Sequence, residues 1–169
     1  MVGMSSSPTL GLRHAVLWVT DPEASAAFYQ EALGLVVKSR MGDAVFMTSP
    51  NSTTDHDLGL FRTTETSPGR PRQVGLYHLA WEVATLEELA EAKIRLGAMG
   101  ALVGENNHGV SRSLYCQDSD GIEFEIMWEV PLELLDENAP SNVALDLAVD
   151  ISRWGPNRSG RGASPQTGL

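Results

Sequence analysis

Two histidines and one glutamate of this sequence stand where they could share a metal ion. The tripeptides Leu12-Arg13-His14 and Leu76-Tyr77-His78 are displaced by the same 64 positions, which indicates an internal repeat. Glu125 alternates with apolar neighbours on both sides, so it points to the opposite face of a strand, where a carboxylate needs a partner. Two histidines and one carboxylate form the facial triad typical of non-haem Fe(II) oxygenases. The sequence therefore predicts a metal site made by His14, His78 and Glu125.

The first half of the chain must supply a strand and a helix that position His14. Residues 10–19 read as a strand, and Asp21 and Pro22 then open a helix as its cap and first residue. Gly34 ends that helix. Three short strands are predicted after it, at residues 36–39, 44–49 and 57–63.

The second half repeats this order. Residues 74–83 read as a strand, and Thr85 with Glu88 forms a capping box that begins a helix. That helix is expected to turn Leu86, Leu89, Ala90 and Ile94 inward, and three strands follow near 101–105, 112–117 and 122–129. The sequence thus predicts an α+β fold of two βαβββ modules. Neither module covers its sheet alone, so we expect them to form a curled mixed sheet with a metal-binding cleft.

The ends of the chain differ from its middle in composition. Residues 1–8 and 155–169 are rich in small and polar side chains, and both are predicted to be flexible tails. Between them, residues 9–130 form the predicted domain, with modules at 9–63 and 74–130. Residues 131–154 are too apolar to remain in solvent, so this extension is expected to pack on the domain or on a dimer partner.

Composition and charge exclude several classes of partner. The chain has 169 residues with 42% hydrophobic content, which is the size of one ordinary globular domain. Its 22 acidic and 12 basic side chains give a net charge of -10, which repels nucleic acids and anionic membranes. The lone Cys116 and the absence of any long apolar run predict a cytoplasmic protein.

Several motifs together resemble the vicinal oxygen chelate superfamily. This superfamily includes glyoxalases, bleomycin-resistance proteins, fosfomycin-resistance enzymes and extradiol dioxygenases. The matching features are the strands that carry His14 and His78, the helix with Phe28-Tyr29 and Leu33-Gly34-Leu35, and Asp118-Ser119-Asp120-Gly121 leading to Glu125. The resemblance covers roughly residues 10–129 and implies a glyoxalase-like fold.

Within that superfamily, the remaining histidines resemble those of single-domain type I extradiol catechol dioxygenases. The matching stretches are Asp55-His56-Asp57-Leu58 and His108-Gly109-Val110-Ser111, the second followed by Tyr115. The resemblance implies an Fe(II) enzyme, with Mn(II) as the alternative ion, that cleaves a small aromatic diol with O2. It further implies that His56 is the acid/base residue, that His108 and Tyr115 hydrogen-bond the catecholate, and that the protein is a homodimer.

Three other functions of the superfamily stay open from the sequence. A glyoxalase-type isomerase uses a fourth ligand, and shifting Glu125 back by the 64-residue repeat lands on Phe61, although Glu65 lies close by. A thiol transferase uses the same triad but gives no role to His56 and His108. A metal-free binding protein of the bleomycin-resistance type would leave the three polar groups without a purpose.

Overall fold

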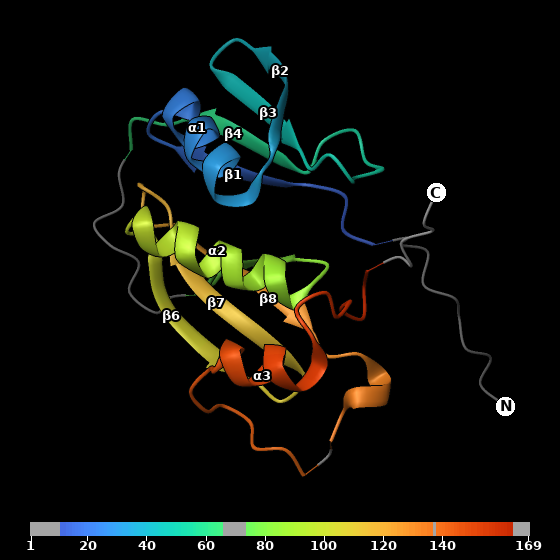
Figure 1. Ribbon diagram of the computed structural model, residues 1–169. Coiled ribbons are helices and arrows are strands. Elements are labelled where there is room, and N and C mark those ends of the chain that lie inside the picture. The colour runs from blue at the N-terminus through green and yellow to red at the C-terminus, as the bar shows by residue number, and fades with distance from the viewer. Residues whose placement is uncertain (1–10, 66–73, 137, 164–169) are drawn as a thin grey trace, which may run out of the picture. The chain divides into compact units, whose positions relative to one another are not determined.

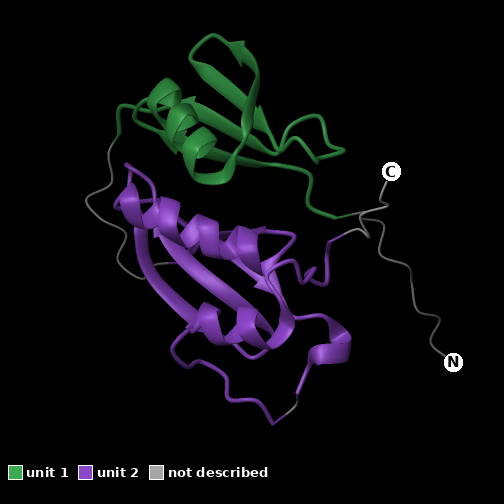
Figure 2. Ribbon diagram, in the orientation of Figure 1, with its two compact units in different colours: residues 1–66 green, residues 67–169 purple. Residues whose placement is uncertain are grey.

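The computed structural model describes residues 11–65, 74–136 and 138–163. It divides into two compact units, residues 1–66 and 67–169, which Figure 2 shows in two colours. The predicted tail at 1–8 and the last six residues lie outside the described residues. No described helix is long and apolar enough to cross a membrane.

The first unit contains one βαβββ module. Its four-stranded sheet has the order β1-β4-β3-β2, with β1 parallel to β4 and the other pairs antiparallel. Its elements are β1 (Ala15–Val19), α1 (Pro22–Leu33), β2 (Val36–Met41), β3 (Ala44–Thr48) and β4 (Leu58–Arg62).

Helix α1 covers one face of this sheet, and its ends are where the sequence predicts them (Figure 1). The Asp21 side chain accepts hydrogen bonds from the backbone N–H groups of Glu23 and Ala24, and Gly34 ends the helix in the left-handed conformation at φ 69°. Alternate residues of β1, Leu17 and Val19, are buried.

The second unit repeats the module and adds an extension. Its sheet has the order β5-β8-β7-β6, with β5 parallel to β8 and the other pairs antiparallel. The predicted α+β class with two βαβββ modules is therefore confirmed. The elements of this unit are β5 (Leu79–Glu82), α2 (Leu86–Ala98), β6 (Leu102–Asn107), β7 (Ser111–Gln117), β8 (Glu123–Glu129), the 3₁₀ helix η1 (Leu132–Leu134) and α3 (Leu147–Trp154).

Helix α2 carries the predicted capping box but packs through a slightly different face. Leu86, Leu89, Ala92 and Leu96 are buried, whereas Ile94 is 75% exposed. The expectation that Ile94 turns inward is wrong, because at 100° per residue it lies on the other side of the helix from Leu89 and Leu96.

The Thr85 cap allows a first test of the fold. Its hydroxyl accepts from the Glu88 N–H, while the Glu88 carboxylate accepts from the Thr85 N–H. Thr85→Ala should lower the free energy of unfolding by about 1 kcal/mol, since it removes the acceptor at the helix start. Urea denaturation measures this, and Thr64→Ala, an exposed residue after β4, is the control. Equal stability of the two variants would contradict the role of the cap.

The extension packs on its own unit. Helices α2 and α3 lie on the same face of the β5–β8 sheet (Figure 1). Trp154 of α3 packs on Trp128 of β8, with ring centroids 5.8 Å apart. The buried Arg112 guanidinium of β7 also binds the buried Asp150 carboxylate of α3, through two hydrogen bonds of 2.6 and 3.1 Å.

Residues 155–163 differ from the loose tail that was predicted to begin at 155. The Gly160 N–H donates to the Ala84 carbonyl, the Arg161 N–H donates to the Glu129 carbonyl, and the Trp128 indole N–H donates to the Arg158 carbonyl. The order of this segment is not predictable from its Gly-, Ser- and Arg-rich composition, because backbone hydrogen bonds rather than apolar side chains hold it.

Candidate functional site

The face of the second sheet opposite α2 and α3 carries the predicted polar side chains. On β8, Phe124 and Ile126 are buried on the helix side, and Glu125 points the other way. In the β7–β8 register Glu125 lies opposite Tyr115. His78 comes directly before β5, the other neighbour of β8. Three residues that are far apart in the sequence therefore meet on one sheet face.

His78 and Glu125 form a close pair on this sheet face. The His78 Nε2 lies 3.1 Å from the Glu125 Oε2, and both side chains are largely buried. The buried Nδ1 of His78 has no hydrogen-bond partner among the described residues. The other ring nitrogen, Nε2, is the one that faces Glu125 and could coordinate an ion. Two ligand atoms about 2.1 Å from one ion, at right angles, lie about 3.0 Å apart. The pair therefore fits two neighbouring ligands of a divalent metal ion.

His108 and Tyr115 extend this cluster. The His108 Nε2 lies 2.7 Å from the Tyr115 hydroxyl, and the Tyr115 ring is 5.8 Å from the His78 ring. Burial, followed by the charge of Glu125, raises the pKa of Tyr115 above its ordinary value. Tyr115 therefore keeps its hydroxyl hydrogen at neutral pH and offers it for hydrogen bonding.

Asn142 is a further member of this cluster that sequence reasoning missed. Its Oδ1 lies 2.9 Å from the Nδ1 of His108. Asn142 belongs to the extension, which has no counterpart in the first module, so the internal repeat gave no signal for it.

In the first unit, the parallel pairing of β1 and β4 brings two histidines together. His14 directly precedes β1 and His56 lies two residues before β4, and these strands pair from Ala15 with Leu58. The two imidazole rings stack with centroids 4.5 Å apart and an interplanar angle of 29°. Phe46 packs edge-on against the His56 ring at 5.0 Å. The local fold thus places a predicted ligand beside the predicted acid/base residue.

The Asp55 carboxylate determines which ring nitrogen of His56 donates a hydrogen bond. The His56 Nδ1 lies 2.9 Å from an Asp55 carboxylate oxygen, and the Lys38 ammonium lies 2.8 Å from the other. The hydrogen bond from His56, then that from Lys38, lowers the pKa of Asp55 to about 2. Since an ionised carboxylate only accepts, the Nδ1 of His56 donates and its Nε2 is left as a proton acceptor.

The predicted triad draws its ligands from both units. His78 and Glu125 belong to the second unit, and His14 belongs to the first. Within either unit, the described residues contain no group of three His, Cys, Asp or Glu side chains able to hold one ion. The pairs His78–Glu125 and His14–His56 are observed, and their joint action on one metal stays a prediction.

Comparison with known proteins decides the family. Residues 11–126 match the model of the Glyoxalase/Bleomycin resistance protein/Dioxygenase superfamily. The chain belongs to this superfamily. It is 28% identical to catechol-2,3-dioxygenase of Bacillus subtilis over 82% of this chain and 48% of that protein. It is 27% identical to metapyrocatechase 2 of Cupriavidus necator over 86% of this chain and 44% of that protein. The chain thus spans about half the length of these curated relatives.

Solved structures support the same fold. The fosfomycin resistance protein FosX of Listeria monocytogenes, solved with Mn(II) and sulfate, matches with a TM-score of 0.56 and 23% identity. That match covers 70% of this chain and 89% of the other. This likeness shows that the two chains share a fold.

The strand register shows which residue of the first module is equivalent to Glu125, and this is where a fourth metal ligand of the glyoxalase type would lie. Glu125 pairs with Ala80 of β5, and Val16, the repeat counterpart of Ala80, pairs with Gly59. The structural equivalent of Glu125 is therefore Gly59 rather than Phe61, because the first module is two residues shorter between its paired strands. Gly59 has no side chain, and a Cβ there would lie 3.3 Å from atoms of Val16 and Phe61.

With Gly59 at this position, the described part of the first module lacks the fourth metal ligand that a glyoxalase-type isomerase would need. Glu65, which a register error would have brought into play, lies beyond the end of β4 at Arg62. The described first module thus offers no carboxylate at the position equivalent to Glu125.

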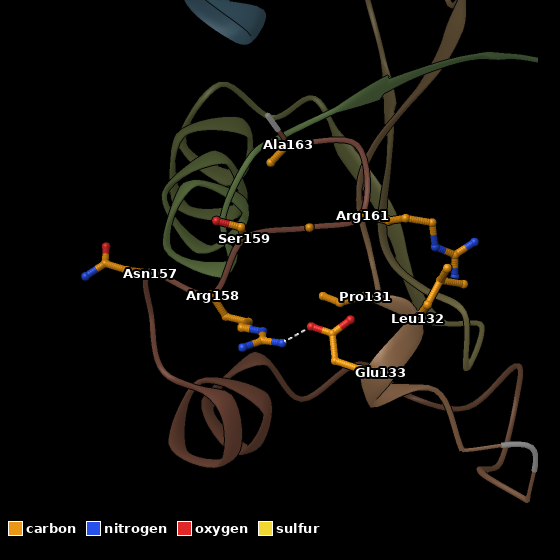
Figure 3. A pocket seen from close by; sticks show the side chains of 9 residues that line it. Pro131, Leu132, Glu133, Asn157, Arg158, Ser159, Arg161 and Ala163 are labelled. Atoms are coloured by element: carbon orange, nitrogen blue, oxygen red, sulfur yellow. Dashed lines mark hydrogen bonds and ion pairs between the residues drawn. The ribbon is translucent and has the colours of Figure 1, made fainter. Parts of the chain in front are cut away.

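A hollow elsewhere in the second unit contains none of the predicted site residues. It has a volume of about 540 Å³, and an ion pair between Arg158 and Glu133 crosses it (Figure 3). Glu133 pairs with Arg158, and Glu129 lies 3.9 Å from Arg161, so both cations of this hollow have a carboxylate nearby and it gives no basis for an anion site. Its lining consists of Pro131, Leu132, Glu133, Asn157, Arg158, Ser159, Gly160, Arg161 and Ala163.

Proposed function

We propose that this superfamily member is an Fe(II)-dependent extradiol dioxygenase that cleaves a catechol-type aromatic ring. The observation that carries the proposal is the His78–Glu125 pair at 3.1 Å, beside the hydrogen-bonded His108 and Tyr115. The likeness to two proteins named as catechol-cleaving enzymes supports this choice within the superfamily. The missing carboxylate at Gly59 counts against glyoxalase chemistry.

The proposed ligands are His14, His78 and Glu125. His14 is included because it directly precedes β1, as His78 directly precedes β5, and each of these strands pairs in parallel with the last strand of its module. When bound, the ferrous ion would offer adjacent positions to both catechol oxygens and to O2, with Mn(II) as the alternative ion.

The chain's own side chains would handle the substrate protons. His56, with Nδ1 donating to Asp55, can take a proton from a catechol hydroxyl at Nε2 and later return it. Tyr115, bonded to His108, would contact the substrate oxygens from the second unit. Phe46 and Phe61 give the first unit an apolar surface next to His56, which suits an aromatic ring.

Anaerobic reconstitution with Fe(II), followed by air and a panel of catechols including 2,3-dihydroxybiphenyl, tests the proposal. The expected result is a coloured ring-opened product with O2 consumed in equal amount. Conversion of a hemithioacetal without O2 uptake would instead indicate an isomerase. Failure of the native chain to retain any divalent metal would indicate a binding protein.

His56→Ala should separate metal binding from turnover. Because His56 is proposed to move protons and not to coordinate the ion, the variant should keep its iron and lose about 10²- to 10⁴-fold in kcat. Metal analysis and steady-state kinetics on the same preparation measure both quantities. Asp43→Ala, at the exposed β2–β3 turn, is the control. Loss of iron together with activity would contradict the acid/base assignment.

The proposal also includes a homodimer in the cytoplasm, as the resemblance to single-domain members implies. Light scattering after gel filtration tests the assembly.

A further inference from the structure

The extension returns to the site face of the second unit at Asn142. A two-way backbone pairing holds it there, since the Asn107 N–H donates to the Val143 carbonyl at 3.0 Å and the Val143 N–H donates back at 3.2 Å. Asn142 has a φ of 58° and is the only non-glycine residue in the described part of the chain with a positive φ. Asparagine tolerates this conformation better than most side chains.

The Asn142 amide oxygen collects two donors. The Nδ2 of Asn106 donates to it at 3.3 Å, and the Nδ1 of His108 lies 2.9 Å away. Because an amide oxygen only accepts, the Nδ1 of His108 must carry a hydrogen. In the neutral imidazole the Nε2 then has a lone pair, which accepts the Tyr115 hydroxyl hydrogen at 2.7 Å. The bonds run in one direction, from Tyr115 through His108 to Asn142.

We infer that Asn142 is a positioning residue whose amide oxygen fixes the Nδ1–H tautomer of His108 and thereby turns the Tyr115 hydroxyl hydrogen toward His108. The lone pairs of the Tyr115 oxygen are then left to accept a hydrogen bond from a substrate hydroxyl. Without the amide, His108 can carry its hydrogen on Nε2 and donate to Tyr115, which would reverse the polarity that Tyr115 presents. The inference rests on the proposed function for its catalytic consequence, and on the observed contacts alone for the tautomer.

Three further hydrogen bonds hold the backbone around His108 in place. The His108 N–H donates to the Ser111 carbonyl, and the Gly109 N–H donates to the Asn107 side chain at 2.8 Å. The Arg112 guanidinium donates to the Gly109 carbonyl at 3.2 Å. The backbone of the turn is therefore fixed by groups other than Asn142, so that replacing Asn142 should change the imidazole's partner more than the turn.

A matched pair of variants tests the role of the side chain. Asn142→Gly keeps the left-handed backbone and removes only the amide, whereas Asn142→Asp keeps an acceptor oxygen. Asn138→Gly, an exposed change in the same segment, is the control for added chain flexibility. Nitrogen-15 NMR of the full, metal-free chain, labelled at histidine, reports which ring nitrogen of His108 is protonated, with His108→Gln used to assign the signals.

The expected result is the Nδ1–H tautomer in the native chain, in Asn142→Asp and in Asn138→Gly, and a shift toward Nε2–H in Asn142→Gly. In the iron-loaded enzyme, kcat/KM should fall roughly 10- to 100-fold in Asn142→Gly and stay within a few-fold in Asn142→Asp. An Nε2–H tautomer in the native chain, or an unchanged tautomer in Asn142→Gly, would overturn the inference. If the tautomer shifts as expected but no catechol is cleaved by the native enzyme, only the proposed function fails.

Discussion

His78→Ala, His14→Ala and Glu125→Gln are each expected to abolish metal retention. The loss in affinity should exceed the roughly 10- to 100-fold that removal of an outer-shell partner costs, because each variant deletes one of three protein ligands. Activity should disappear with the metal. For Glu125 and His78 the expectation rests on the observed 3.1 Å pair, and for His14 on its equivalent place in the first module.

Metal content after dialysis against a defined free-ion concentration measures the effect. Glu123→Gln is a matched control, because Glu123 lies two residues before Glu125 on the same side of β8 and contacts Gln117 at 3.4 Å. This control should bind metal as the native chain does. Equal metal content in His14→Ala and the native chain would refute the assignment of His14 while leaving the His78–Glu125 pair in place.

Asp150→Ala is expected to produce the largest loss of stability among single replacements in the extension. Arg112 and Asp150 are 6% and 7% exposed, and their side chains make two charge-assisted hydrogen bonds. Removing the carboxylate leaves a buried guanidinium without its counter-charge, which costs about 3–5 kcal/mol. For a chain of this size the melting temperature should fall by about 6–20 °C.

Calorimetry and urea denaturation measure this loss. Asp146→Ala, which removes only the helix cap of α3, is the matched control and should cost about 1 kcal/mol. The double variant Arg112→Met with Asp150→Leu should recover much of the lost stability, because both charges are then gone. A single variant no less stable than the cap variant would contradict the buried pair.

Local signals predicted the fold well. The Asp21 cap, the left-handed Gly34 and the Thr85 capping box all form as their residue types require. Alternation along residues 122–129 put Glu125 and Phe124 on opposite faces of β8. The histidine repeat put His14 and His78 at equivalent positions of the two modules, although both lie just before β1 and β5 rather than inside the longer strands predicted at 10–19 and 74–83. These features depend on neighbours within a few residues, so the sequence alone was sufficient.

Features that depend on register or on distant contacts were missed. The 64-residue repeat measures spacing along the chain and does not reveal a difference of two residues between paired strands. The repeat therefore points to Phe61 as the equivalent of Glu125, whereas the strand register has Gly59 there. Asn142 reaches His108 from 34 residues away, and nothing in its local sequence indicates that contact. Residues 155–163 are held through backbone bonds that composition does not show.

The asymmetry between the two modules has a practical consequence for anyone shortening the gene. A stop codon placed after Glu129 would still encode every strand of both sheets. It would nevertheless remove Asp150, which pairs with Arg112, and Asn142, whose side chain bonds the His108 Nδ1. It would also remove the Arg158 carbonyl that accepts from the Trp128 indole N–H. The Gly162 N–H also donates to the Glu82 side chain, so a shortened version should run at least to Gly162.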